Sequence, residues 1–184
     1  MEFVYVSGRR CLDFAGTMKH RTSDREELLT DPRLLSEWAV QAGLLDAGID
    51  VDDGELAAAI ELREAIYRTV KARLEHRRPQ VADVELLNEL ATQPQLTPRL
   101  LRTGATRREG TASQLLATLA ADLLDLIAGG DIENVKGCGH PGCTRLYVDS
   151  SRGKNRNWCG MGTCGNRAKV QAFRARQRAS AGAR

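Results

Sequence analysis

The chain has few aromatic residues, no long apolar run and almost no acidic residues in its last third. Aromatics make up 4% of the 184 residues, so any core is built mainly from Leu, Ala, Val and Ile. No run of about 18 apolar residues is present, which argues against a helix that crosses a membrane. Residues 1–10 contain no apolar h-region and no small-residue cleavage site. We therefore expect a cytoplasmic protein with reduced thiols.

The shortage of acidic residues is confined to residues 137–184, which contain ten Lys and Arg and one acid, Asp149. That segment has a net charge of +9, whereas residues 1–136 carry 17 basic and 23 acidic side chains, a net charge of −6. An acidic body joined to a basic end is typical of nucleic-acid-binding proteins. The alternative is a generic basic tail without a specific partner.

The basic segment also holds four of the five cysteines. Cys138 and Cys143 form one C-x4-C pair, Cys159 and Cys164 form another, and 15 residues separate the pairs. Each short loop can turn two sulfurs inward, and four thiolates suit one tetrahedral Zn²⁺ at about 2.3 Å. The spacing therefore predicts one zinc ion per chain, held by these four residues.

Other interpretations of the cysteines and of a nearby histidine remain open at this point. The four thiols could form two disulfides or stay free, although the expected compartment favours metal. His140 could replace one cysteine as a ligand, or it could be a solvated loop residue. Cys11 lies far from the pairs, beside Leu12 and Phe14, and is most simply a small buried residue.

The hydrophobic pattern predicts an α+β protein that is mostly helical, with a small N-terminal sheet. Residues 3–6 are expected to form a strand, and residues 11–15 a second strand or the start of a helix. Asp31 as N-cap and Pro32 at the first helical position open a helix. Helices are expected at 32–42, 53–76, 81–92 and 112–128, and residues 94–110 are expected to form a loop or a hairpin that returns to the N-terminal strands.

The same pattern assigns the core-facing side chains. Val84, Leu87 and Leu90 are expected to face inward on one helix, and Ile127 lies on the apolar stripe of the last one. On the long helix, Glu64 and Arg68 have the i,i+4 spacing of a favourable ion pair. We expect a domain at 1–130, a linker at 131–136 and a zinc module at 137–184.

Within the zinc module, residues 144–158 are expected to form a hairpin that connects the two cysteine pairs. A helix follows Cys164, on which Val170 and Phe173 could pack against Trp158 and Tyr147. Knuckle, hairpin and helix in this order give a treble-clef-like zinc finger, in which the metal replaces a core too small to hold itself together.

The basic residues of this module are candidate DNA contacts. Phosphate contacts are favoured over base contacts for each of them. The alternatives are that Arg156 or Arg167 pairs with Asp149, and that Asn166 caps the helix or brackets the backbone. The candidates are Arg152, Lys154, Arg156, Asn166, Arg167, Lys169, Arg174 and Arg178.

The residues around the last ligand resemble a known family. Cys164-Gly165-Asn166-Arg167 reads C-G-N-R, and it occurs with Trp158-Cys159-x-Met161 and Tyr147-x-Asp149-x-Ser151. This pattern is similar to the CGNR zinc finger family, although Gly160 stands where members usually have Ser. Residues 11–17 resemble the L-D-F-x-N-T signature of the ABATE domain, with Gly16 in place of the usual Asn. Leu35-x-x-Trp38 and Leu62-Arg63-x-Ala65-Ile66 also fit that domain.

The resemblance implies a bacterial, nucleoid-associated and stress-related transcriptional regulator whose first domain senses a small ligand. Asp13, Thr17, His20 and Arg21 are the candidate ligand contacts. We therefore expect a zinc-dependent regulator that binds double-stranded DNA, and a homodimer would double its footprint. An RNA-binding or protein-interaction module is the alternative function. The chain has no catalytic Cys–His pair, phosphate-binding glycine loop or HExxH, so we expect no enzyme.

Overall fold

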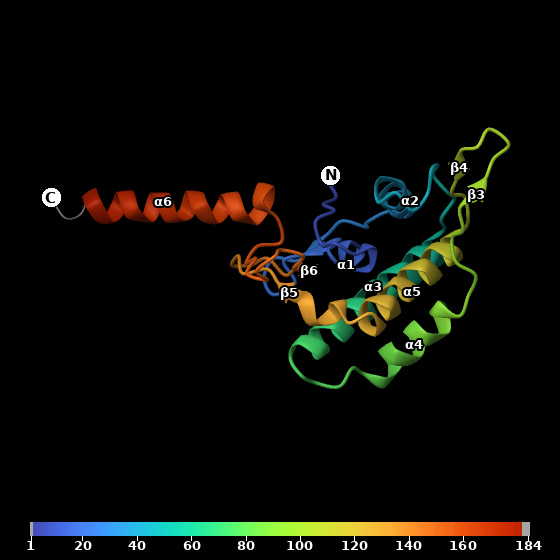
Figure 1. Ribbon diagram of the computed structural model, residues 1–184, viewed down its shortest axis with the longest axis horizontal. Helices are drawn as coiled ribbons and strands as arrows, with labels where there is room; N and C mark the ends of the chain where they lie inside the picture. Colours follow the sequence, from blue (N-terminus) through green and yellow to red (C-terminus); the bar gives the residue numbers. More distant parts are fainter. Residues whose placement is uncertain (1, 182–184) are drawn as a thin grey trace.

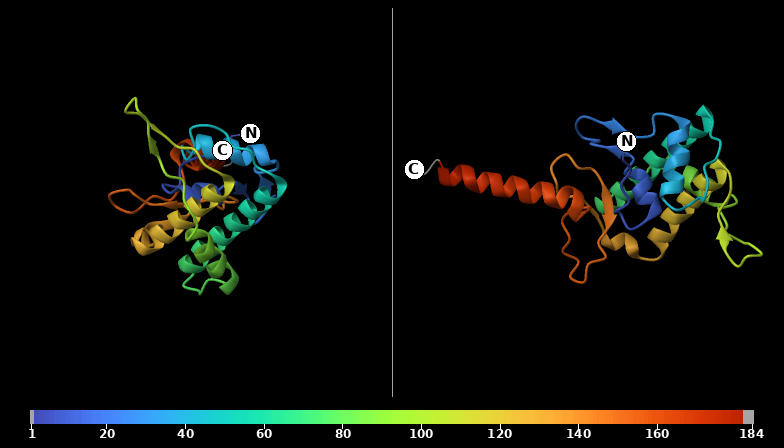
Figure 2. Two further views of the ribbon diagram at one scale, coloured as in Figure 1. Left: turned by 90° about the vertical axis from the view of Figure 1, so that its right-hand side faces the viewer. Right: turned by 90° about the horizontal axis from the view of Figure 1, so that it is seen from above.

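The N-terminal two thirds of the chain form a helical body, from which the zinc module and its last helix project (Figures 1 and 2). The computed structural model describes residues 2–181; within the last helix, it describes side chains as far as Val170 and at Phe173, Arg174 and Gln177. α3 and α5 lie side by side, with α4 packed against both and α1 across them, while α2 packs on α3 (Figure 1). The body helices are α1 (Arg10–Ala15), α2 (Pro32–Gln41), α3 (Asp53–Leu74), α4 (Val81–Ala91) and α5 (Ala112–Ala128).

Three of these helices begin at capped N-termini. The side chain of Asp31 accepts a hydrogen bond from the backbone N–H of Arg33 at the start of α2. Asp52 opens α3 and Thr111 opens α5, each in a reciprocal capping box with the residue three positions on. Each such cap contributes about 1 kcal/mol. The four helices predicted from the pattern are confirmed, with ends that differ by at most two residues.

The core between the helices consists largely of leucine and alanine. The few aromatics are concentrated in one place, where the rings of Phe14 and Trp38 lie with their centroids 4.9 Å apart. Leu87 is buried as predicted, but Val84 and Ile127 are wrongly assigned to the core, because their side chains are 40% and 36% exposed. On α4 and α5 the buried face is thus narrower than the apolar stripe of the sequence.

A buried ionic cluster lies between α3 and the N-terminal residues. Arg63 is 1% exposed, and its guanidinium donates to both carboxylate oxygens of Glu27 and to Glu64. Glu64 also pairs with Arg21. The predicted Glu64–Arg68 pair is wrong, because Arg68 binds the buried Asp83 of α4 instead. Partners brought together by the fold therefore outcompete the helical neighbour.

Three short antiparallel ribbons complete the fold. They are β1 (Met18–Lys19) with β2 (Glu26–Glu27), β3 (Arg99–Leu100) with β4 (Thr106–Arg107), and β5 (Val135–Gly137) with β6 (Leu146–Val148). The expected strand at residues 3–6 does not form a ladder, and residues 11–15 belong to α1. The hairpin expected within 94–110 is present as β3–β4, but it pairs with no N-terminal strand and projects from the body (Figure 1).

The segment expected to be a linker is folded. Residues Asp131–Asn134 form a 3-10 turn, and β5 follows immediately. Ile132, Val135 and Leu146 are buried in the core of the body, so the zinc module and the body share apolar packing. In the described part of the chain, no helix is long and apolar enough to cross a membrane.

Candidate metal centre and nucleic-acid interface

The four paired cysteines converge on one point. Their sulfurs all lie within 4.8 Å of one another, and none is in a disulfide. The Sγ of Cys159 lies 3.6 Å from that of Cys164 and 4.0 Å from that of Cys143. A tetrahedral Zn²⁺ with Zn–S bonds of about 2.3 Å sets its sulfurs about 3.8 Å apart. The donor set and its spacing therefore fit one zinc ion, and His140 is not part of this cluster.

Each C-x4-C loop is here called a knuckle: Cys138–Cys143 is the first and Cys159–Cys164 the second. The backbone of each knuckle explains why the sulfurs point inward. In the first knuckle the N–H of Cys143 donates to the carbonyl of His140, and Gly142 has φ +77°, a conformation that favours glycine. The second knuckle contains one π-helical turn, Met161–Gly165, which ends one residue after the last ligand and leads directly into α6 (Asn166–Ala181). The backbone N–H of Cys159 donates to the Sγ of Cys138 at 3.4 Å, which links the two knuckles.

The crowded thiols perturb one another's ionisation. A hydrogen bond from Cys143 lowers the pKa of Cys159 to about 5, despite burial. Burial raises the pKa of Cys164 to about 12. A bound Zn²⁺ would hold all four sulfurs as thiolates.

Asp149 organises the loop between the cysteine pairs. Its buried carboxylate accepts hydrogen bonds from the Ser151 hydroxyl at 2.6 Å, from Lys136 Nζ at 2.7 Å and from the backbone N–H groups of Ser151 and Arg156. The bonds from Lys136 and Ser151 hold the pKa of Asp149 well below its usual range. The hairpin expected over residues 144–158 is not formed, because β6 pairs with β5 and this loop follows it. The hairpin of the finger therefore carries the first knuckle in its loop.

Arg156 is half-buried and directs much of its guanidinium toward the backbone of the module. Its guanidinium lies 4.4 Å from the centroid of the Tyr147 ring and donates to the carbonyls of Trp158, Cys159 and Val6. The charge pattern predicts a DNA contact at this position. Nε and Nη2 of the side chain are bound to backbone carbonyls around the metal site, and a DNA contact by Arg156 stays a prediction.

The remaining DNA candidates lie at the surface. Arg152 and Lys154 are exposed in the Asp149 loop, where Lys154 Nζ donates to the carbonyl of Asp149. Asn166, Arg167, Lys169 and Arg174 are exposed along α6, with Asn166 as its first residue. The side chain of Arg178 lies outside the described residues. The alternative pairing of Arg167 with Asp149 is not observed, because the ion-pair partner of Asp149 is Lys136.

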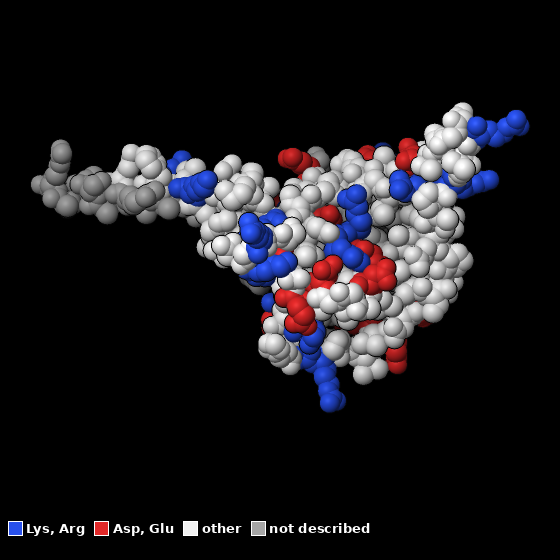
Figure 3. All heavy atoms as spheres, viewed as in Figure 1, with Lys and Arg blue, Asp and Glu red and all other residues white. Residues whose placement is uncertain are grey.

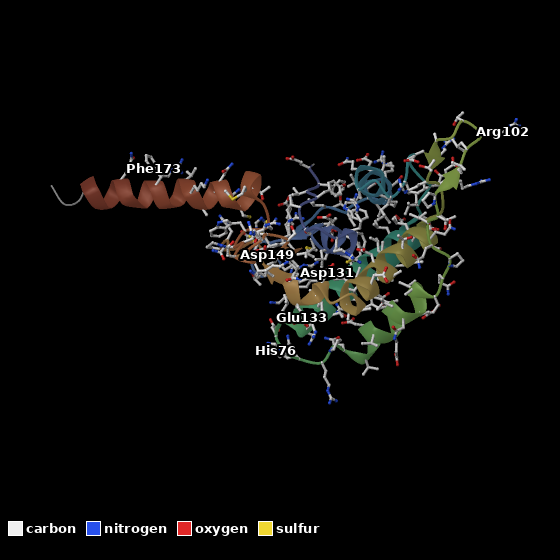
Figure 4. The ribbon with its side chains drawn as sticks, viewed as in Figure 1. His76, Arg102, Asp131, Glu133, Asp149 and Phe173 are labelled. Atoms are coloured by element: carbon white, nitrogen blue, oxygen red, sulfur yellow. The ribbon has the colours of Figure 1, made fainter. Side chains whose placement is uncertain are left out.

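α6 projects from the body (Figures 1 and 2), and two apolar residues lie among its basic ones. Val170 and Phe173 are 47% and 54% exposed, so the prediction that they pack on Trp158 and Tyr147 is wrong. Figure 4 shows Phe173 on the projecting part of the helix, away from the body. The small zinc core closes without α6, with Tyr147, Cys159 and Cys164 at its centre and Val6 and Trp158 against them.

The predicted ligand residues do not form one cluster. Asp13 accepts from the N–H of Ser7, and Thr17 donates to the carbonyl of Phe14 and accepts from Arg63. The guanidinium of Arg21 binds Glu64 and stacks 4.0 Å from the centroid of the Tyr67 ring. The polar groups of Asp13, Thr17 and Arg21 thus bind within the fold, and their role as ligand contacts stays a prediction.

His20 alone of these four borders a cleft, which has a volume of about 710 Å³. The cleft lies between β1, the metal site and the first turns of α6. Its other walls include two residues that were not among the predicted site residues, Gly16 and Arg145, together with Arg167 and Arg174. Arg145 donates to the carbonyls of Val4 and Gly16 at 3.0 and 3.4 Å, so it connects the first knuckle to the N-terminal residues.

The sequence marks Gly16 as unusual, because this residue stands where the ABATE signature usually has Asn. In this structure a Cβ at Gly16 would overlap Arg145 Nη1, so any other residue here requires the guanidinium to move. No local pattern identifies Arg145 itself, since its partners lie more than 120 residues away in the chain.

Comparison with known families gives two matches. The sequence model of the ABATE family, described as "Putative stress-induced transcription regulator", matches residues 8–130. The CGNR zinc finger matches residues 134–177, which include all four cysteines, so the metal of this site is one Zn²⁺. No curated protein matches the chain. Because the first match spans more than half of the sequence, the protein belongs to the ABATE family and carries a CGNR zinc finger.

Proposed function

We propose that the protein is a zinc-dependent transcriptional regulator that binds duplex DNA through α6 and the adjoining loop, and that it acts by binding and not by catalysis. The observation that carries the proposal is the position of α6. The helix begins two residues after the last zinc ligand and projects beyond the body, and its described cations are exposed (Figure 2). The zinc site therefore fixes the direction of a basic helix.

Charge and dimensions support duplex DNA as the partner. Across residues 2–181, no acidic side chain forms an ion pair with Arg167, Lys169 or Arg174. Sixteen helical residues span about 24 Å. The major groove of B-DNA, about 12 Å wide, admits an α-helix, and arginine can bind a phosphate or the edge of guanine with two parallel hydrogen bonds.

Titration of a duplex at several salt concentrations tests this proposal. The probe is a random-sequence duplex of about 40 bp, about 136 Å long, bound by zinc-loaded full-length protein. Three phosphate contacts from α6 give a slope of log K against log salt of about −2.7, and Arg174→Gln makes the slope less steep by about 0.9. Arg78→Gln, an exposed arginine in the turn before α4, is the matched control and leaves the slope unchanged. An affinity that is insensitive to salt contradicts the proposal, and stronger binding to single-stranded RNA of equal length favours the RNA alternative.

We also propose that the cleft between β1 and α6 receives a small anionic effector. Its volume falls within the range of about 300–1,000 Å³ of small-molecule sites, although the metal occupies part of it. Four Lys and Arg side chains line it beside His20, against two carboxylates. The cations are Lys19, Arg145, Arg167 and Arg174, and the carboxylates are Glu2 and Glu26. Because α6 supplies one wall, an anion bound there would compete with DNA phosphates for Arg167 and Arg174.

Calorimetric titration of the zinc-loaded protein with a panel of small carboxylates and phosphates tests the effector site. Binding that is weakened by His20→Gln and by Arg167→Gln, but not by Arg78→Gln, supports the cleft. Binding that all three variants leave unchanged places the effector elsewhere.

A further inference from the structure

The acidic body carries one basic projection that the zinc finger does not explain. The segment 97–110, here called the ribbon, contains β3 and β4 and the turn between them. It extends from the end of the body opposite to α6, and Arg102 lies near its tip (Figures 1 and 4). All four strand residues are exposed, and Leu100 is 77% exposed. The ribbon is therefore a surface element that contributes little to the core.

The charge of the ribbon is opposite to that of its surroundings. It has four arginines and one glutamate, a net charge of +3, whereas the rest of residues 1–136 has 13 basic and 22 acidic residues. Figure 3 shows blue side chains projecting from this end of the molecule. Arg107 pairs with Glu109, but no acidic side chain of residues 2–181 forms an ion pair with Arg99, Arg102 or Arg108.

The strand register increases this concentration of charge. Arg99 lies directly opposite Arg107 in the antiparallel pair. Like charges in such a position destabilise a ribbon, and a two-stranded hairpin is marginally stable by itself. The base is held by the loop after α2, where Arg108 N–H donates to Asp46 Oδ2 at 2.6 Å and the Arg108 carbonyl accepts from Asp46 N–H. Folding alone gives no reason for paired arginines on a tethered ribbon, whereas a polyanion would neutralise them.

We propose that the ribbon is a second DNA-binding element, which contacts the phosphate backbone through Arg99, Arg102 and Arg107. This inference rests on the proposed function, which places a duplex on the finger of the same chain. The major groove admits a two-stranded ribbon as well as a helix. Because α6 and the ribbon lie at opposite ends of the long axis of the molecule, they contact separate stretches of a bound duplex (Figure 1).

The test uses zinc-loaded full-length protein and a duplex of about 40 bp, long enough to reach both ends of the molecule. The variant Arg99→Gln/Arg102→Gln removes two unpaired charges from the ribbon. The matched control Arg33→Gln/Arg78→Gln removes two exposed charges from the body. Each lost phosphate contact lowers the salt slope by about 0.9, which at about 0.1 M salt weakens binding about 8-fold per contact. The ribbon variant should therefore bind up to about 60-fold more weakly, with a slope smaller by about 1.8.

The outcomes separate this inference from the function on which it rests. A weaker affinity and a smaller slope in the ribbon variant, but not in the control, support it, provided that thermal unfolding is unchanged. If the ribbon variant binds like the wild type while Arg174→Gln weakens binding, the ribbon proposal fails and the finger proposal stands. If the wild type shows no salt-dependent binding, both fail. If the ribbon variant keeps DNA binding and loses binding to vesicles that contain phosphatidylserine, the ribbon arginines serve an anionic membrane surface and the ribbon proposal is overturned.

Discussion

Gly16 and Arg145 connect the body to the zinc module, and a double-mutant cycle measures that connection. Gly16 is the C-terminal cap of α1 and has φ −75° and ψ −3°, a conformation that alanine adopts without strain. In the wild type, however, a Cβ at this position would displace the Arg145 guanidinium. That displacement breaks two hydrogen bonds from a cation to the carbonyls of Val4 and Gly16.

The magnitude of the coupling follows from those two bonds. Hydrogen bonds to a charged group contribute about 1.5–3 kcal/mol each when well buried, and Arg145 is half-buried with one long bond, so we expect a total loss of about 1–3 kcal/mol. Glycine to alanine in a compatible conformation stabilises by about 0.4–1 kcal/mol through the unfolded state. Gly16→Ala should therefore lower the free energy of unfolding in the wild type, and raise it slightly in the Arg145→Ala background.

Urea unfolding at a fixed free zinc concentration, followed by circular dichroism, measures the four corners of this cycle. A coupling energy of about 1–3 kcal/mol is expected. If Gly16→Ala changes the free energy of unfolding equally in both backgrounds, the two effects are additive and Arg145 does not hold the contact. Gly43→Ala, at a glycine with φ +69°, is the control for backbone strain alone and should be destabilising in both backgrounds.

Three further changes address the metal, the Asp149 loop and the buried ionic cluster. Chelation of zinc, or Cys164→Ser, should unfold the zinc module while α3–α5 keep their helical signal. The Val148 N–H, which donates to the Ser7 carbonyl, should then show rapid hydrogen exchange. Asp149→Asn should destabilise the module equally from about pH 6 to 8, because the depressed pKa makes the carboxylate's contribution complete above its ordinary value of 3.8 and lost only as the pH falls below it. Arg63→Met should lower the free energy of unfolding by about 3 kcal/mol, because it leaves two glutamates without their buried partner.

Each of these results has a contrary outcome. Native hydrogen exchange in the metal-free protein would show that the metal is not the core of the module. A deficit of Asp149→Asn that disappears near pH 6 would mean that the carboxylate is already protonated there. For the ionic cluster, Arg33→Met is the control: it breaks an exposed pair with Asp31 and should cost less than about 1 kcal/mol. Equal losses from both variants would contradict a special role for Arg63.

Local patterns were sufficient for the helices and for the metal. Asp31-Pro32, the Asp52 and Thr111 caps and the 3.6-residue periodicity act within a few residues, and the paired cysteines carry their ligand geometry in their spacing. The prediction failed where the partner is distant in the chain. Residues 3–6 read as a strand, but Val6 packs on the zinc core and receives the guanidinium of Arg156, 150 residues away.

The apolar residues of the last helix show a different reason for failure. The spacing of Val170 and Phe173 is that of a buried stripe, and hydrophobicity alone favours burial. Their positions on a projecting helix depend on the direction in which the second knuckle ends, which one π-helical turn determines. A basic helix with exposed apolar residues is understandable if its partner is another molecule, and the sequence of one chain does not contain that partner.

β6 explains why the two family segments behave as one body. Side chains alternate along a strand, and here Leu146 and Val148 pack with the helical core while Tyr147 packs with the zinc ligands. The strand is thus a wall shared by two cores, and Arg145 and Arg156 on either side bind Val4 and Val6 of the same N-terminal segment. A rotation of the whole zinc module against the body would have to break both cores. The effector that we propose for the cleft would instead act on the first turns of α6, which form a wall of the cleft and extend beyond both cores.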